Sequence, residues 1–253
     1  MYLGGICKQK PPLYAAALFL LFAHAACAET TCADAVAFTH STVSFTKRFN
    51  EDERKQHDPA LLGIRGTAWF LSSRSMATAA HVAQSMELSD KDWNEAEIER
   101  AGFKQPVFVR IQSIAGSEAE KIAVIELKSP IPDAQPLQIR TAPLTAGEPV
   151  TSLGYPRDRL RFASGRFVRY GDDGELAGRA LFELSDGDDR LALDHGASGA
   201  PVLDCEGRVA AVVSNVFART MSFLSQPIRV STAWGSPNVA AVPITVLEDH
   251  TGR

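Results

Sequence analysis

Residues 66–82 read GTAWFLSSRSMATAAHV and contain the first of two stretches that decide the fold. Apolar and β-branched residues on either side of a Ser-rich turn predict two strands joined by a tight connection. The second strand ends in small residues, which deliver His81 on a short loop. A histidine in such a place is a candidate general base, because neutral imidazole accepts a proton near pH 7.

The second stretch, residues 194–202, reads DHGASGAPV and leads into an apolar strand. Small residues around Ser198 let a carbonyl group come close to the hydroxyl. Glycine backbone also lets the amides of Gly196 and Ser198 point at one spot, where an oxyanion would develop. By itself such a stretch more often holds a turn serine, so it makes Ser198 a candidate nucleophile only in combination with the first stretch.

Taken together, the two stretches resemble the trypsin-like serine peptidases, especially the compact bacterial branch related to HtrA-type and glutamyl-endopeptidase-type enzymes. That family carries Thr-Ala-Ala-His around the base and Gly-x-Ser-Gly-x-Pro around the nucleophile, and this chain has both in the same order. The resemblance covers residues 60–248. Further matches are Gly66-Thr67-x-x-Phe70, Gly154-Tyr155-Pro156 and Pro243.

The resemblance implies an all-β fold of two antiparallel β-barrels, with the active site in the cleft between them and one or two short helices. It also implies the chemistry of a serine endopeptidase. His81 would take the proton from Ser198, and attack on a peptide would give an acyl-enzyme that water hydrolyses. No cofactor and no metal is expected.

Strand signals recur along the chain independently of the resemblance. Five prolines in Lys128–Pro149 separate two strand-rich halves and suit a connection between barrels, with a boundary near residue 140, although composition alone also allows a single β-sandwich. One helix is expected over Ser89–Ala101, capped by Ser89 and with Trp93, Ala96 and Ile98 facing inward. The predicted strands are Thr42–Phe45, Gly66–Leu71, Val107–Ile111, Ile122–Leu127, Val150–Leu153, Arg166–Tyr170, Ala180–Leu184, Val209–Val213 and Ala240–Val246.

The first 28 residues have the pattern of a signal peptide. A short basic region precedes the apolar run Leu13–Ala23, and small residues in Ala26-Cys27-Ala28 predict cleavage after Ala28. A retained anchor and a lipoprotein are the alternatives. We expect an exported protein, periplasmic or secreted, with an N-terminal barrel over 29–140, a C-terminal barrel over 141–253 and no stable membrane anchor after cleavage.

Net charge and cysteine content limit the binding partners and the metal sites that the chain could have. Cleavage would take the formal charge from −4 to −6, because residues 1–28 contain two lysines and no Asp, Glu or Arg. A mildly acidic chain has no general attraction for nucleic acid. Only Cys32 and Cys205 would remain, and in an oxidising compartment they could form a disulfide or stay as two isolated thiols. Neither has ligands at a spacing that suits zinc.

The expected third catalytic residue departs from the family pattern. The family places an acid just before an Ile-Ala-Val strand, and here that position is Lys121. A lysine cannot accept a hydrogen bond from imidazole and opposes its protonated form. Glu120, through a one-residue shift at the strand entrance, or Glu118, from the preceding loop, could take the place of the acid.

Substrate contacts are expected from the pocket base and from one strand edge. Ala192 and Leu193 make the expected base of the pocket apolar, and Val213 and Ser214 would pair with an extended peptide. His195, near the pocket mouth, is expected to be solvated. Ala197 replaces an acid that activated zymogens use, so no further processing is expected.

Three functions remain open from the sequence. The leading prediction is an endopeptidase that acts on peptides or proteins, as a monomer. A binding protein that keeps the fold without turnover is the second, because of Lys121. A serine esterase is the third.

Overall fold

The computed structural model describes residues 32–57, 60–116, 121–172, 174–185, 193, 195–216, 219–223, 226–230 and 237–247. Thr31–Arg253 form one compact unit. The predicted signal peptide, residues 1–28, lies outside the described residues.

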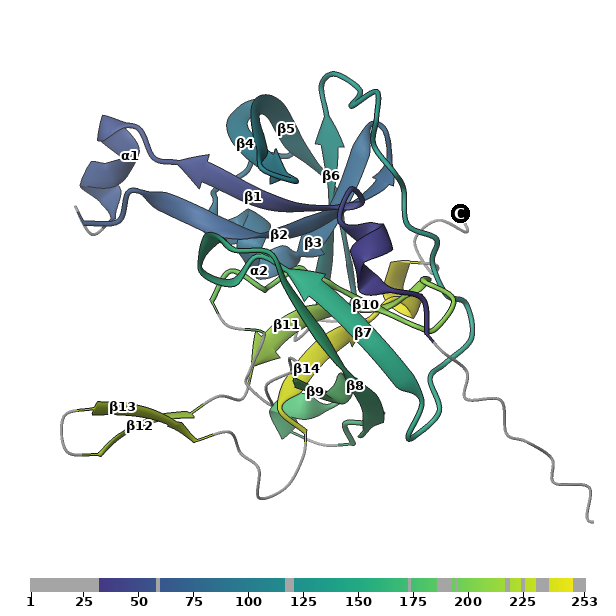
Figure 1. The fold of residues 1–253 in the computed structure, drawn as a ribbon. Helices are drawn as coiled ribbons and strands as arrows, with labels where there is room; N and C mark the ends of the chain where they lie inside the picture. Colours follow the sequence, from purple (N-terminus) through teal and green to yellow (C-terminus); the bar gives the residue numbers. More distant parts are fainter. Residues whose placement is uncertain are drawn as a thin grey trace, which may run out of the picture. The chain divides into compact units, whose positions relative to one another are not determined.

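The first half of the unit is a closed six-stranded barrel in the order β1-β2-β3-β6-β5-β4, with every neighbouring pair antiparallel (Figure 1). Its strands are β1 (Thr42–Arg48), β2 (Gly63–Ser72), β3 (Ser75–Ala79), β4 (Asn94–Arg100), β5 (Phe103–Gly116) and β6 (Lys121–Leu127).

The second half is another closed six-stranded antiparallel barrel, in the order β10-β11-β14-β9-β8-β7 (Figure 1). A separate hairpin pairs β12 with β13. The strands are β7 (Pro149–Gly154), β8 (Arg161–Tyr170), β9 (Ala180–Ser185), β10 (Pro201–Leu203), β11 (Val209–Val216), β12 (Arg219–Phe223), β13 (Gln226–Val230) and β14 (Val239–Pro243). The predicted double barrel is confirmed, and each segment predicted as a strand overlaps an observed one.

Each barrel has its own apolar core, and a third cluster joins them. Phe45 and Phe70 are fully buried in the first barrel, and Phe182 is fully buried in the second. Trp69 from β2 and Leu153 from β7 belong to the third cluster, which draws residues from both barrels. Burying one such side chain contributes about 1.5–3 kcal/mol, so this cluster favours the docking of one barrel on the other.

The helix predicted over Ser89–Ala101 is wrong, because Asn94–Arg100 is strand β4. Ser89 does accept from the amides of Lys91 and Asp92, but that bond closes a turn before the strand. Ala96 and Ile98 are buried at a spacing of two, the period of a strand.

Residues 245–247 are helical, and two short α-helices lie wholly within the described residues, in line with the prediction of one or two short helices. They are α1 (Glu51–Gln56) and α2 (Ala80–Ser85), and three 3₁₀ turns accompany them, namely η1 (Ala35–Phe38), η2 (Pro156–Asp158) and η3 (Gly174–Leu176). Asn50 and Glu53 form a capping box at the start of α1. His81 was expected on a loop, but it lies in the first turn of α2.

The predicted disulfide joins Cys32 to Cys205. Cys205 lies in the turn between β10 and β11, and its carbonyl accepts a 3.0 Å hydrogen bond from the amide of Ala33. The segment before η1 is therefore fastened to the second barrel at two points.

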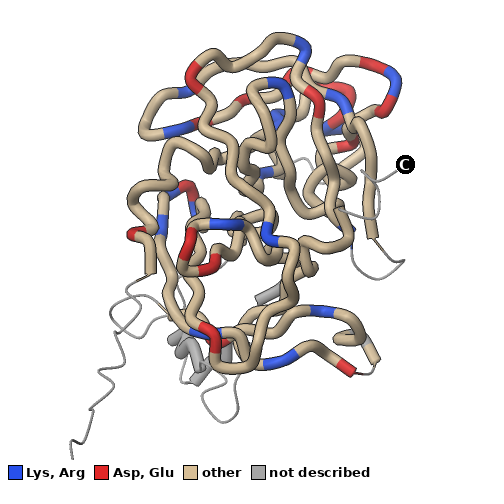
Figure 2. The backbone as a smooth tube through the Cα atoms, turned by 90° about the vertical axis from the view of Figure 1, so that its right-hand side faces the viewer, with Lys and Arg blue, Asp and Glu red and all other residues tan. Residues whose placement is uncertain are grey.

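Basic and acidic residues are interleaved along the described backbone (Figure 2). No helix in the described part of the chain is long and apolar enough to cross a membrane.

Candidate active site

The loop that carries Ser198 precedes β10 of the second barrel and is bonded to β2 of the first. The amide of Thr67 donates a 2.8 Å hydrogen bond to the Ser198 carbonyl. The Thr67 hydroxyl donates a 2.7 Å bond to the Gly196 carbonyl and accepts a 3.0 Å bond from the amide of Tyr155. One fully buried threonine of the first barrel therefore holds the serine loop of the second.

Two glycines let the serine loop approach the segment that carries His81. Gly199 has φ +91°, and a Cβ there would overlap the Thr67 carbonyl oxygen and would lie 3.1 Å from the amide nitrogen of Ala79. A Cβ on Gly66 would lie 2.6 Å from Val82 and 3.2 Å from the Ser198 carbonyl oxygen. Ala79 and Val82 flank His81 in the chain, so the structure brings the two predicted catalytic loops together.

Ser198 is half-buried, and its hydroxyl lies 3.4 Å from the carbonyl oxygen of Ser214, to which it donates a hydrogen bond. The ring of His81 is not its hydrogen-bond partner in this state. Such bonds are often long or misaligned without substrate and tighten in the complex.

His81 lies in the first turn of α2, where part of its surface remains open to solvent. Partial burial of the ring, and then the positive charge of Arg179, hold the pKa of His81 below its ordinary value of 6.5. Arg179 is itself buried, directly before β9 of the second barrel. Both effects keep the imidazole neutral near pH 7, the form that accepts a proton.

The backbone around Ser198 leaves the N–H groups of Gly196 and Ser198 without a hydrogen-bond acceptor among the described residues. The His195 carbonyl accepts from the amide of Arg157 at 3.1 Å, and the Ala197 carbonyl accepts from Ala200 at 2.9 Å. In a trans peptide the N–H points opposite to the carbonyl, so these bonds turn the N–H groups of Gly196 and Ser198 the other way. Neither N–H has an acceptor among the described residues, which leaves two donors for an oxyanion.

Lys121, at the position where the family pattern would put an acid, is the first residue of β6. Ile122 pairs with Ala79, so Lys121 at the start of β6 lies close along the ladder to the residues that lead into His81. Lys121 and Ala123 are two residues apart on β6, so their side chains lie on the same face of the strand. Ala123 packs in the same core cluster as Val82 of α2. Glu118 and Glu120 lie outside the described residues.

Of the residues predicted to contact the substrate, some are buried in the core of the second barrel and one lies at an irregular position of a strand. Leu193 and Val213 are buried in the core of the second barrel, while Ala192 lies outside the described residues. Ser214 sits at an irregularity of β11, where Val213 pairs with Ala241 and the next paired residue is Asn215. His195 is exposed, as expected.

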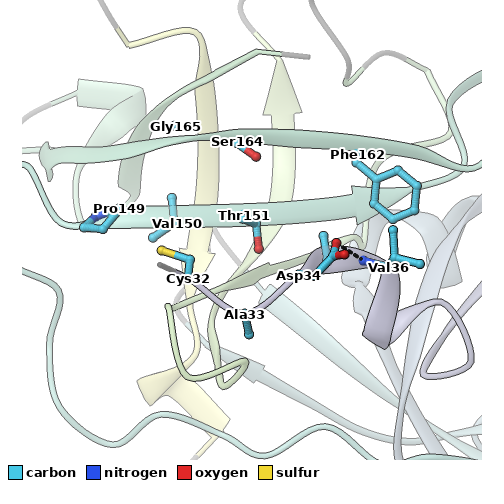
Figure 3. Close-up of a pocket in the computed structure, with 11 residues that line it drawn as sticks. Cys32, Ala33, Asp34, Val36, Pro149, Val150, Thr151, Phe162, Ser164 and Gly165 are labelled. Atoms are coloured by element: carbon cyan, nitrogen blue, oxygen red, sulfur yellow. Dashed lines mark hydrogen bonds between the residues drawn. The ribbon is translucent and has the colours of Figure 1, made fainter. Parts of the chain in front are cut away.

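Within the described residues, no cluster of His, Cys, Asp and Glu could hold a metal ion. A pocket of about 480 Å³ is lined by Cys32–Val36 and by residues of β7 and β8, including Thr151 and Phe162 (Figure 3). Neither His81 nor Ser198 lines this pocket, so it takes no part in the candidate site.

Two residues that shape the site were not predicted as functional. Thr67 was noted only as part of the Gly-Thr-x-x-Phe match, and its hydroxyl proves to bond the serine loop. Arg179 carried no sequence signal, because only the folding of the second barrel brings its charge near His81.

Comparisons with known proteins agree with this geometry. The sequence model of the trypsin-like peptidase domain matches residues 66–212. No curated protein sequence matches the chain.

Similar solved structures include two forms of one protease and Deg5. The active form of the Rv3671c protease from M. tuberculosis is 16% identical, with a TM-score of 0.54 over 87% of this chain and 86% of that one. Its inactive form is 19% identical, with a TM-score of 0.53 over 85% and 89%. Deg5 is 13% identical, with a TM-score of 0.54 over 85% and 89%. At these identities the likeness shows a shared fold.

Proposed function

The chain belongs to the trypsin-like peptidase family, whose sequence model covers more than half of it, and we propose that it is an exported serine endopeptidase. Ser198 is the nucleophile and His81 its general base. The amides of Gly196 and Ser198 form the oxyanion hole, and Glu120 is the candidate for the third catalytic residue.

The contact between the serine loop and the first barrel is the strongest support for this proposal. The serine loop is bonded to Thr67 and packs through Gly199 against Ala79, two residues before His81. A turn serine with a structural role would need no such contact with the other barrel. The arrangement supports a nucleophile and a base held at the junction of two barrels.

The proposed reaction uses each of these groups in turn. His81, neutral at pH 7, takes the proton from Ser198 as the hydroxyl attacks the peptide carbonyl. Two preorganised amides then hold the oxyanion, and each such donor lowers the barrier by about 3–4 kcal/mol. His81 returns the proton to the leaving amine, and water hydrolyses the acyl-enzyme.

The substrate is an extended peptide that pairs with β11. The irregularity at Ser214 leaves that residue without a partner on β14, and its carbonyl lies beside the Ser198 hydroxyl. A substrate strand along this edge would present its scissile bond to the serine. The Cys32–Cys205 disulfide supports an oxidising, extracytoplasmic location.

Hydrolysis of a fluorogenic peptide library tests the proposal. The wild-type protein should cleave internal peptide bonds, and both Ser198→Ala and His81→Ala should lower kcat by at least about 10³-fold. Cleavage that survives in Ser198→Ala would contradict the assignment of the nucleophile.

Lys121 favours a second candidate, a peptide-binding protein that keeps the fold without turnover. The side chain has no hydrogen bond or ion pair with another described residue, and a lysine cannot accept the imidazole hydrogen bond that the family's acid accepts. Peptide binding measured by calorimetry, with no hydrolysis by the wild type, would favour this candidate.

A further inference from the structure

The turn around η2 supports the peptide that carries the proposed oxyanion donor. The amide of Arg157 donates a 3.1 Å hydrogen bond to the carbonyl of His195. Gly196 has φ +99°, and a Cβ there would lie 2.6 Å from the carbonyl oxygen of Tyr155. The His195–Gly196 peptide is therefore fixed by backbone atoms of this turn.

The turn itself has an unfavourable backbone conformation. Arg157 (φ 50°, ψ 41°) and Asp158 (φ 67°) are consecutive residues in the left-handed region, and neither is glycine. Each such residue costs about 1–2 kcal/mol, although aspartate tolerates the conformation better than most. Contacts from outside the turn must therefore offset the cost.

One of these contacts crosses between the barrels. The guanidinium of Arg65, on β2 of the first barrel, forms an ion pair with the carboxylate of Asp158 in the second. Arg65 is held from its other side, because its Nε donates a 3.0 Å hydrogen bond to the Thr46 hydroxyl on β1. The carboxylate thus meets an arginine that is already oriented by the first barrel.

We propose that Arg65 and Asp158 are a positioning pair for the oxyanion hole. The pair holds the left-handed turn, the turn presents the Arg157 amide to the His195 carbonyl, and that bond directs the Gly196 N–H toward the oxyanion. Neither side chain touches the reacting atoms. The inference rests on the proposed function, since it concerns a donor used in that reaction.

A positioning role and a purely structural one differ in what they change. The side chains of Arg65 and Asp158 are 32% and 56% exposed. Ion pairs of this exposure contribute at most about 1 kcal/mol to stability, so their loss leaves folding intact. An oxyanion donor acts in the transition state and not on bound substrate, so misdirecting it lowers kcat and leaves KM unchanged.

Four variants test the pair. Asp158→Asn removes the charge but keeps a residue that tolerates a positive φ, and Arg65→Gln removes the other partner. Each should lower kcat about threefold to fivefold with KM unchanged, and Arg65→Lys should recover part of the loss. The double variant Arg65→Gln/Asp158→Asn should be no slower than either single variant, because both remove one interaction.

The exposed pair Arg166–Glu183, on β8 and β9, supplies a matched control. Arg166→Gln and Glu183→Gln change the same charges and should leave kcat unchanged. Affinity for a peptide aldehyde, which forms a tetrahedral adduct with the serine, should fall in parallel with kcat in the Arg65 and Asp158 variants only.

The outcomes separate this inference from the proposed function. A wild-type protein that hydrolyses no peptide overturns the proposed function and the inference with it. An active wild type whose Asp158→Asn variant keeps kcat within about twofold overturns the inference alone. A change confined to KM overturns it as well.

Discussion

The backbone amide of Thr67, in the first barrel, donates a 2.8 Å hydrogen bond to the carbonyl of Ser198, in the second. The two sequence stretches that point to a nucleophile and a base are thus physically joined. Because one residue from each barrel makes this bond, the candidate site exists only when both barrels are folded and docked.

Replacing Thr67 by valine should destabilise the fold and slow turnover. Valine keeps the shape, but the Gly196 carbonyl and the Tyr155 amide both lose their partner. Each unsatisfied buried group costs about 1–3 kcal/mol, so the free energy of unfolding should fall by about 2–6 kcal/mol in urea denaturation.

Thr42→Val is the matched control for that variant. Thr42 is fully buried on the neighbouring strand β1, and its hydroxyl has no hydrogen-bond partner among the described residues. Its replacement should be neutral or stabilising. Equal losses in the two variants would contradict the role given to the Thr67 hydroxyl.

Gly199→Ala should be far more damaging than Gly102→Ala. Both glycines have a positive φ, +91° and +84°. A Cβ at Gly102 meets nothing within 4 Å, whereas one at Gly199 overlaps Thr67 and Thr78. Guanidinium denaturation should show a loss of about 1 kcal/mol for Gly102→Ala and more than about 4 kcal/mol for Gly199→Ala. Similar losses would mean that the serine loop does not pack tightly on the first barrel.

The pH profile should respond to Arg179. Partial burial and the Arg179 charge both lower the pKa of His81, and only the neutral ring can act as base. The acid limb of kcat/KM should therefore lie below pH 6.5, the ordinary value for histidine. Arg179→Gln removes a positive charge that disfavours protonation, so the pKa rises and the limb moves to higher pH. A limb that stays in place would show that the charge does not act on His81.

Reducing the disulfide should weaken the unit without abolishing the barrels. Cys32 and Cys205 are 173 residues apart, and a cross-link over so long a loop stabilises by about 3–5 kcal/mol. The double variant Cys32→Ser/Cys205→Ser should lose about this much in urea denaturation. Reductant should then have no further effect on the variant, while it lowers the stability of the wild type.

Much of the fold could be predicted from residue patterns, and the failures have physical causes. Alternating apolar residues and turn signals located the strands because burial on one face repeats every second residue. The segment around Ala96 and Ile98 was assigned to a helix because its few apolar positions also suited a helical face. Its partner β5 follows a two-residue turn at Ala101 and Gly102, both with positive φ, and alanine gives no signal for that conformation.

The candidate site was predictable where the backbone itself supplies the chemistry. Small residues around Ser198 and before His81 allow the two segments to approach each other closely, and these residues can be read directly from the sequence. The pairings of Arg65 with Asp158 and of Arg179 with His81 depend on the docking of distant segments. No local pattern reports such contacts, so they appeared only in the folded chain.

Mapping the adduct of a fluorophosphonate probe by peptide mass spectrometry tests the central claim most directly. The account predicts one modified residue, Ser198, in the wild-type protein, and no adduct in Ser198→Ala. Labelling of His81→Ala should be far slower, because the base is missing. An unlabelled wild-type protein, or an adduct on a different serine, would contradict the account.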